Sequence, residues 1–489
     1  MAGRNLALAI AFFFLVLVMP QMVTPAKSSA KSPRFTMNPR TKKQTRDFLK
    51  NHGSSDTADL LPGQQEGEGG SDGQSKSGGG GDREMQAPAT NAGVYIFSYD
   101  IGTPPQRVSG ALDIASDLVW TQCAPCATCD TTQPFYPLNS TTAAAVECTN
   151  LACQQFVPQT CSAADDSSQC SYTYMYGGGG GAANTTGFLV TDSFTFDTIR
   201  VDGVVFGCGL DNVGDFGDAS GVIGLGRGNL SLVSQLQVDR FSYHFAPDDS
   251  VDAQSFILFG EDAAPQTSRT FSTRLLASDA NPNLYYVDLA GIKVDGKDLD
   301  IPRGTFDIGK DGSGGVALTI TTLVTLLDEV AYKLLRQAMV SGIGLSTVDG
   351  SALGLDLCYT SQSMAKAKVP SMALVFSGGA VMELEMGNYF YMDETTGLEC
   401  LTIVPSPAGD GSLLGGLIQT GTHMIYDISG SKLVFESLEQ AGAAAPPPLG
   451  SSKSSDKTVG RRSWSAPPPL ISPAVLLIQF ACVVLYMFK

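Results

Sequence analysis

The chain has 489 residues, of which 43% are hydrophobic and 16% charged, enough apolar material for two lobes of ordinary size. Its formal net charge of -17 at pH 7 argues against nucleic acid as a partner, because phosphate recognition needs a basic surface. An acidic or extracellular setting fits this charge better.

Residues 1–26 have the features of a secretory signal peptide. One cation stands among the first four residues, an apolar run covers 6–19, and the small residues Thr24 and Ala26 follow it. The alternative, a signal anchor, is disfavoured because the run is short for a membrane span.

Residues 27–92 have two compositions. The part before residue 51 is rich in Lys and Arg, and the rest is rich in Gly, Ser, Gln and Asp and cannot build a core. The composition predicts a prosegment followed by a disordered linker, and a basic tail without function fits it equally well.

From Gly93 onward, short β-type runs alternate with Gly, Pro, Asn and Asp, which predicts an all-β protein with few short helices. The clearest predicted strands are 201–206, 255–259, 285–289, 373–376 and 432–435. Helical periodicity is best at 327–339, and a shorter helix is predicted at 231–236.

A weak internal repeat indicates two related β lobes with a cleft between them. The turn after Asp113 is followed later by GVIGLG at 221–226, and the region 316–326 is followed by SLLGG at 412–416. We place the first lobe at 93–262 and the second at 263–440.

The C-terminal part consists of an Ala-, Pro- and Ser-rich linker at 441–469 and a hydrophobic tail at 470–489. Such a tail behind a spacer is typical of a removable lipid (GPI) anchor signal, with attachment near 451–455. We favour this over a tail anchor. The expected location is therefore extracellular, in the cell wall or on the outer face of the plasma membrane.

Ten of the eleven cysteines lie between Cys123 and Cys400, and the last is Cys482 in the tail. An even number in a secreted chain predicts disulfides. The cluster of Cys123, Cys126 and Cys129 has spacing that also fits zinc, but the chain has only three histidines and the compartment is oxidising. We expect no metal and no cofactor.

The candidate catalytic group is Asp113, which an apolar run delivers into a turn of small residues before a second strand ending at Trp120. A carboxylate at the end of a sheet is accessible to a substrate. Acid–base work on an amide needs a second group in a different protonation state, so one carboxylate is half of a catalytic pair.

The order of several motifs resembles the pepsin-fold aspartic proteases, in particular their plant nepenthesin-like branch, over residues 93–436. The motifs are YDIGTPPQ (99–106), DLVWTQC (117–123), YMYG (174–177), FGCG (206–209), GLGRG (224–228), SLVSQL (231–236), FSY (241–243) and YD (426–427). The resemblance implies a bilobal fold with two lobes of the six-stranded-barrel type, and a monomer that binds a peptide or protein in the cleft.

In this family each lobe contributes an Asp-Thr-Gly or Asp-Ser-Gly turn, and the two carboxylates share a proton. The first turn keeps Asp113 and Ser116 but has Ile114 and Ala115 in place of the other two residues.

In the second turn the resemblance places Leu318 at the aspartate position, followed by Thr319, Ile320 and Thr321. The second carboxylate is thus missing. If the glycine position needs a positive φ, Ile320 would be strained there. Losing one member of a catalytic set costs several orders of magnitude in rate.

No other acid is well placed to substitute. Asp328 and Glu329 belong to the following helix, and Asp117 points along the strand behind the first turn. We therefore expect an aspartic endopeptidase homologue that is weakly active or inactive. The alternatives are a non-proteolytic binding or glycosidase-inhibitor-like protein on the same fold, and a product in decay.

The resemblance makes Tyr176 the flap tyrosine that covers the substrate and Trp120 its hydrogen-bond partner. The flap tip is replaced by glycines at 178–181, which makes clamping costly in entropy. Both aromatics fit equally well as core residues.

The resemblance also implies five disulfides, and it places His244 where relatives have a cysteine. The implied pairs are Cys123–Cys126, Cys129–Cys208, Cys148–Cys170, Cys153–Cys161 and Cys358–Cys400. His244 is then a structural replacement. Sequons at Asn139, Asn184 and Asn229 are candidate glycosylation sites.

Overall fold

The computed structural model describes residues 33–37, 42–52 and most of 95–438, with short gaps at 130–132, 157, 162–168, 177–182, 215, 217–218, 249, 251–252 and 408. The predicted signal peptide, the Gly-rich linker, the glycine-rich flap tip and the hydrophobic tail lie outside the described residues. Within the described part, no helix is long and apolar enough to cross a membrane.

The first lobe is built on a closed barrel, as predicted. Its strands follow the order β2-β3-β9-β4-β8-β7, and a further pairing of β2 with β7 closes six strands into a ring. The short strand β5 (Ala144–Ala145) and the flap strand β6 (Ser171–Tyr176) also pair with β7. The barrel strands are β2 (Ile96–Ile101), β3 (Gln106–Asp113), β4 (Val119–Gln122), β7 (Ala183–Phe196), β8 (Ile199–Val213) and β9 (Gly221–Gly224).

The second lobe contains a strand path and two smaller sheets. The path runs β12-β13-β16-β24-β17-β23, through β12 (Phe271–Leu276), β13 (Tyr286–Val287), β16 (Val316–Leu318), β24 (Ser412–Leu414), β17 (Thr325–Leu327) and β23 (Ile403–Pro405). One smaller sheet is β15-β14-β19-β20, from β15 (Lys297–Asp298), β14 (Leu289–Val294), β19 (Met372–Phe376) and β20 (Val381–Leu384). The other is β18-β22-β21, from β18 (Cys358–Thr360), β22 (Leu398–Leu401) and β21 (Phe390–Asp393).

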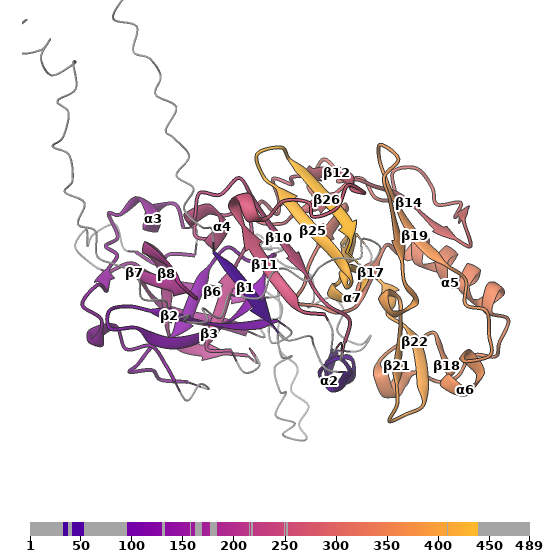
Figure 1. Cartoon of the computed structure of the whole chain (residues 1–489), viewed down its shortest axis with the longest axis horizontal. Coiled ribbons are helices and arrows are strands. Elements are labelled where there is room, and N and C mark those ends of the chain that lie inside the picture. Colours follow the sequence, from indigo (N-terminus) through magenta and orange to yellow (C-terminus); the bar gives the residue numbers. More distant parts are fainter. Residues whose placement is uncertain are drawn as a thin grey trace, which may run out of the picture. The chain divides into compact units, whose positions relative to one another are not determined.

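Six strands form a sheet to which both halves of the chain contribute, in the order β1-β11-β10-β25-β26-β12 (Figure 1). They include β1 (Arg34–Met37), β11 (Ser255–Phe259), β10 (Arg240–His244), β25 (Thr422–Asp427) and β26 (Lys432–Ser437). The first of them comes from the predicted prosegment, and Phe35 of β1 stacks on Phe97 of the barrel with ring centroids 4.2 Å apart. The N-terminal segment is therefore part of the fold.

Helices are few and mostly short. They are α2 (Lys42–His52), α3 (Leu151–Gln154), α4 (Leu232–Gln235), α5 (Glu329–Ile343), α6 (Ser361–Met364) and α7 (Gly416–Gln419). The helix predicted at 327–339 begins at Glu329, because Leu327 ends β17 and the Asp328 carboxylate caps the helix by accepting from the amides of Val330 and Ala331.

The predicted strands are found with one difference. Four of them coincide with or lie inside β8, β11, β19 and β26, and the helix predicted at 231–236 contains α4, which Ser231 caps. The strand predicted at 285–289 is broken between β13 and β14 at Asp288, whose carboxylate accepts hydrogen bonds from Arg274 and Ser377.

Candidate active site

Two loops of the same design hold the turns that the sequence singled out. In the first lobe, β9 lies between β3 and β4, parallel to β3 and antiparallel to β4. In the second, β24 lies between β16 and β17 in the same way. Asp113 ends β3 and pairs with Gly224 of β9, and Leu318 ends β16 and pairs with Leu414 of β24. The two turns are thus equivalent by strand register.

The Asp113 carboxyl group is almost fully buried, with 5% of the residue exposed. Its Oδ1 accepts a hydrogen bond from the Ala115 amide at 2.8 Å. Burial raises the pKa of Asp113, contacts with Ala115 and Ser116 oppose this, and the charge of Asp117 adds a little to the rise. Asp117 is the one other acid that affects this pKa among the described residues, and no second carboxyl hydrogen-bonds to Asp113 there.

The second turn has two buried apolar side chains, and its two threonine hydroxyls contact each other. Leu318 and Ile320 are each 1% exposed and belong to the main hydrophobic cluster, together with Ile114 of the first turn. The Thr319 hydroxyl lies 3.0 Å from the hydroxyl of Thr321 and also accepts from the Thr321 amide. The Thr319 hydroxyl therefore bonds within its own turn.

The strain expected at Ile320 is absent. Among the described residues, positive φ angles outside glycine occur only at Asp197, Gln237, Asp295 and Ser431. Ile320 thus has an ordinary backbone conformation, and a β-branched side chain is accommodated by burial in the core.

The other nearby acids are held elsewhere. The Asp117 carboxylate accepts from the Tyr174 hydroxyl at 3.0 Å, and Asp328 is used as the helix cap described above. Glu329 pairs with Lys333 at 2.6 Å on the exposed face of α5. In the structure, none of the three is engaged with Asp113 by a hydrogen bond.

The aromatic pair of the flap lies close to Asp113. The Trp120 indole nitrogen donates to the Tyr176 hydroxyl at 2.6 Å, and Phe216 packs edge-on against both rings. Burial raises the pKa of Tyr176, and the charge of Asp113 adds to this rise. The structure therefore brings Asp113, Trp120 and Tyr176 together beneath the flap strand β6.

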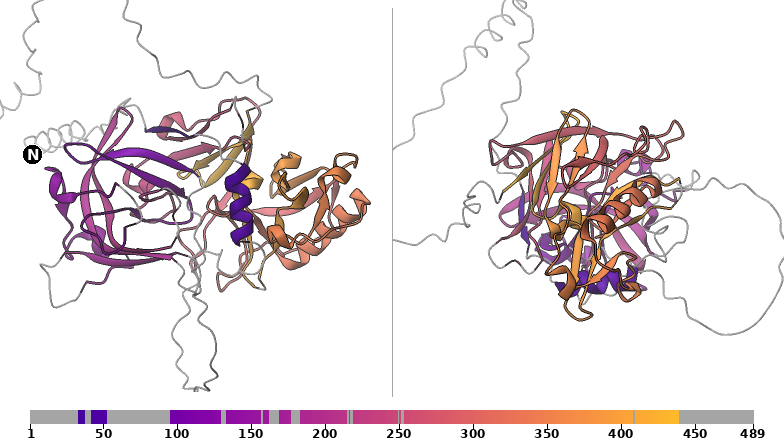
Figure 2. Two further views of the ribbon diagram at one scale, coloured as in Figure 1. Left: turned by 90° about the horizontal axis from the view of Figure 1, so that it is seen from below. Right: turned by 90° about the vertical axis from the view of Figure 1, so that its right-hand side faces the viewer.

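Sequence analysis missed that the N-terminal segment reaches this region. In α2, Phe48 and Leu49 are buried in a cluster that also contains Leu323, two residues beyond Thr321, and Ala115 of the first turn packs against the same cluster. The Tyr391 hydroxyl of β21 donates to the carbonyl of Lys42 at 2.9 Å. In both views of Figure 2 the indigo helix α2 lies beside the orange elements of the second lobe. The amphipathic pattern of 42–52 is the signal that could have revealed this helix.

Five disulfides are present, but four of the implied pairings are wrong. The bonds are Cys123–Cys208, Cys126–Cys129, Cys148–Cys161, Cys153–Cys170 and Cys358–Cys400. Cys123 follows β4 directly, and Thr121 of that strand is in register with Cys208 of β8, so the two cysteine Cα atoms lie 5.3 Å apart. Only the pair in the second lobe agrees with the implied set.

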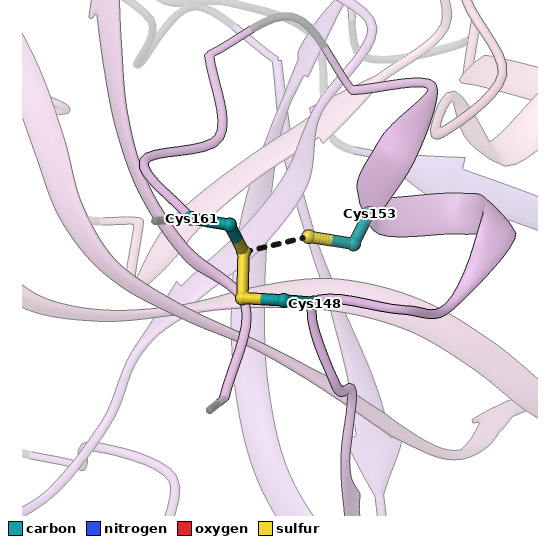
Figure 3. A group of neighbouring side chains, drawn as sticks. All are labelled: Cys148, Cys153 and Cys161. Carbon is teal, nitrogen blue, oxygen red and sulfur yellow. Dashed lines mark hydrogen bonds between the residues drawn. A yellow bond between two sulfur atoms is a disulfide. The ribbon is translucent and has the colours of Figure 1, made fainter. Parts of the chain in front are cut away.

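The cysteines at 148, 153, 161 and 170 form one compact group, so spacing alone could not determine their connectivity. The sulfur atoms of Cys153 and Cys161 belong to different disulfides and still lie 3.4 Å apart (Figure 3). Three of these sulfurs have the spacing of a metal site, yet each is engaged in a disulfide and offers no thiolate.

His244 lies in the sheet shared by the lobes. It is directly opposite His423 across β10 and β25, and His423 Nδ1 lies 2.8 Å from the Glu436 carboxylate. All three side chains are buried. A polar cluster therefore occupies the region where the resemblance implies a cysteine.

The three sequons differ in exposure. Asn139 and Asn229 are exposed, and the Asn229 amide donates to Gln155 at 3.0 Å. Asn184 lies on β7 and is partly buried.

Comparison with known proteins agrees with this geometry. The family models "Xylanase inhibitor N-terminal" and "Xylanase inhibitor C-terminal" match residues 95–261 and 284–437. The chain is 37% identical to aspartic proteinase nepenthesin-2 of Nepenthes gracilis over 347 residues, 70% of this chain and 77% of that protein. It is 32% identical to aspartyl protease 37 of Oryza sativa subsp. japonica over 374 residues, 70% of this chain and 80% of that protein.

Solved structures with the same fold include edgp, with a TM-score of 0.56 and 18% identity over 74% of this chain and 94% of that one. The basic 7S globulin from soybean also has a TM-score of 0.56 and 18% identity, over 73% of this chain and 95% of that one. The matches to both lobes and the identities above 30% over most of the relatives' length show that this chain belongs to the plant nepenthesin-like aspartic proteases of the pepsin fold.

Proposed function

We propose that this chain is an aspartic endopeptidase homologue whose own peptidase activity is weak or absent. The observation that supports this is the register of the two turns: Leu318 pairs with Leu414 as Asp113 pairs with Gly224. Peptide hydrolysis of the pepsin type needs two carboxyl groups, one to activate water and one to protonate the amide carbonyl. A leucine at the second position can do neither.

The surroundings of Asp113 support the same proposal. Its carboxyl is buried, and among the described residues no other carboxyl hydrogen-bonds to it and could share its proton. The second turn presents the apolar side chains of Leu318 and Ile320, so it supplies no carboxylate to hold and activate a water molecule. A lone carboxyl cannot be general base and general acid in the same step, because the two roles need different protonation states.

The test compares the purified chain with the variant Ile114→Thr/Ala115→Gly/Leu318→Asp/Ile320→Gly. Both are incubated with denatured haemoglobin between pH 3 and pH 6, with and without pepstatin, and circular dichroism checks that each is folded. We expect cleavage only by the fourfold variant. Adding Asp113→Asn to that variant is the matched control and should remove the regained activity. Pepstatin-sensitive cleavage by the unmodified chain, lost on Asp113→Asn, would contradict the proposal.

A second candidate function is binding without turnover. The chain matches models described as xylanase inhibitor over both lobes, and the fold in general binds peptides in its cleft. An inhibitor of a cell-wall glycosidase is thus a possible role on this scaffold. Its test is a xylanase assay with and without the purified chain, in which inhibition supports the role and undiminished xylanase activity counts against it.

The disulfides and the family indicate passage through the secretory pathway. We further propose that residues 1–26 are a signal peptide, that 27–92 are a prosegment-like region, and that 470–489 direct lipid anchoring at the outer face of the plasma membrane. Release of the protein from plant membranes by a phosphatidylinositol-specific phospholipase would support the anchor, and retention would contradict it.

A further inference from the structure

A large cavity lies in the second lobe, apart from the two turns. It has a volume of about 1180 Å³, and its lining comes mainly from β20, β21, β26 and the segments before β12 and after α7. Asp113, Tyr176 and Leu318 do not line it. The cavity is therefore distinct from the site formed by the two turns.

The cavity contains a buried carboxylate without a partner. Glu399 of β22 is 8% exposed, and no hydrogen bond or ion pair to its carboxylate occurs in the part of the chain that the structure describes. Burial raises the pKa of Glu399, and no charge or hydrogen bond offsets this. A mostly buried carboxylate that is left unpaired in this way is free to accept a donor from a ligand.

Two of the other acids of the cavity have partners, and two more, Glu383 and Glu385, are exposed to solvent. Glu436 accepts from His423 and from the Thr267 hydroxyl, and Asp248 accepts from Thr45. The lining has the cations Lys42 and Arg269; Lys42 pairs with Glu394 at 3.1 Å, and neither cation pairs with Glu399 in the described residues. The negative charge of Glu399 is thus left for a positively charged group from outside.

The walls beside Glu399 are apolar and exposed. Met392 of β21 lies directly opposite Glu399 across the strand pair, and it is 39% exposed. Phe271 and Met386 also line the cavity and are 43% and 36% exposed. These are three of the nine large apolar side chains exposed in the described residues, so apolar surface is concentrated here.

We propose that this cavity binds an extended segment of a partner protein that presents an arginine or lysine to Glu399 and an apolar side chain to Met392, Met386 and Phe271. Arginine and lysine combine an apolar stem with a charged head, which matches a carboxylate at the bottom of an apolar wall. Methionine side chains adapt to such ligands.

A protein segment fits better than a small amine for two reasons. The cavity is at least as large as the pockets that hold whole drug-sized ligands. In addition, β21 is the edge strand of its three-stranded sheet, and Phe390, Tyr391 and Met392 of that strand line the cavity. An extended peptide can add to such an edge through main-chain hydrogen bonds.

The test uses the full chain and the fluorescein-labelled peptide Ala-Leu-Arg-Leu-Ala, acetylated and amidated at its ends, with binding followed by fluorescence anisotropy. The comparison peptide carries citrulline in place of arginine and so keeps the shape but loses the charge. We expect Glu399→Gln and citrulline each to weaken binding by about tenfold or more. Glu261→Gln, an exposed glutamate outside the cavity, is the matched control and should leave the affinity unchanged.

Glu399→Gln is a safe variant because it removes an unpaired buried charge and keeps the side-chain shape, and thermal unfolding verifies that it is folded. Met392→Gln tests the apolar wall and should also weaken binding. Equal affinity of the arginine and citrulline peptides, or no binding of either, would overturn the proposal. If agmatine alone binds as tightly as the peptide, the site takes small cations and the proposed protein partner is wrong.

Discussion

Asp113 and Leu318 hold the same register position in two loops of the same design, one opposite Gly224 and the other opposite Leu414. Both residues are buried, but only one can carry a charge. In a working dyad, a shared proton stabilises the pair of carboxyls. Leu318 gives Asp113 no such partner, so ionisation of the buried Asp113 carboxyl lowers the stability of the folded state.

This cost predicts the effect of Asp113→Asn on stability. Burial raises the folded-state pKa of Asp113, so the protonated form is favoured in the fold, and the stability it confers is lost as the pH rises above the ordinary aspartate range. Asparagine keeps the acceptor for the Ala115 amide without the charge. We expect the variant to melt at a higher temperature than the wild type at pH 7, with the difference vanishing as the pH falls below 4.

Thermal unfolding by circular dichroism from pH 3 to pH 7 measures this difference. Asp202→Asn, on an exposed residue of β8 that pairs with Arg200, is a control and should show no comparable gain at pH 7. A lower melting temperature for Asp113→Asn at pH 7 would mean that the ionised carboxylate is stabilised in the fold and would contradict this account.

The bond between Trp120 and Tyr176 predicts a second effect. Tyr176→Phe removes the acceptor of a buried indole N–H, and leaving such a donor unpaired costs about 1–3 kcal/mol. We expect a lower free energy of unfolding in denaturant and a shift in tryptophan emission, because Trp120 is one of only two tryptophans. Tyr136→Phe, on an exposed ring, is the control. Unchanged stability and emission would show that the bond contributes nothing.

Much of the fold was predictable, because alternating apolar runs and glycine-rich turns determine strand positions locally. Strands such as β11 and β26 and the short helix α4 appeared where the pattern placed them. The strand at 285–289 was the exception, because the side chain of Asp288 turns outward to Arg274 and Ser377 and interrupts it. Such an interruption depends on partners far away in the sequence.

The candidate site was likewise predictable where local motifs define it, and not where distant residues pack against it. Asp113, Trp120 and Tyr176 were predicted from motifs, and the structure brings them together. The packing of Phe48 from α2 beside the turns was not predicted, because a basic composition hides a short amphipathic face. Glu399 was also missed, since an isolated glutamate in a strand gives no sign that its neighbours will bury it.

The corrected disulfides predict a difference in stabilisation. Cys123–Cys208 closes a loop with a sequence separation of 85, and Cys126–Cys129 one of 3. On the chain-entropy model, removing the first costs about 4–5 kcal/mol and removing the second about 2 kcal/mol. Denaturant unfolding of Cys123→Ala/Cys208→Ala and Cys126→Ala/Cys129→Ala compares them. A non-reducing peptide map in which Cys129 is joined to Cys208 would contradict the pairing.

The buried histidines predict how stability depends on pH. The pKa of His244 is lowered to about 4, mainly by burial. The charge of His423, directly opposite, lowers it further, and the backbone carbonyls of Gln254 and Gly421 oppose both effects. The fold therefore holds His244 neutral. As the pH falls from 7 to 4, the unfolded chain takes up a proton that the folded chain does not, which costs on the order of 3 kcal/mol of stability.

His244→Gln removes this titration and should flatten the decline in unfolding free energy between pH 7 and pH 4, measured in denaturant at each pH. For Glu436, hydrogen bonds from His423, Gln266 and Thr267 outweigh burial and lower its pKa to about 2. Its contribution to stability is therefore lost only as the pH falls below the ordinary glutamate range, at the acid end of this window, and the variant and the wild type share this loss. Gln235→Ala on α4 is a suitable destabilised control, since it loses the hydrogen bonds to Val205 without removing an ionisable group. Its curve should lie lower but keep the slope of the wild type. If His244→Gln keeps that slope as well, then His244 is protonated in the folded state, and the sheet tolerates the charge.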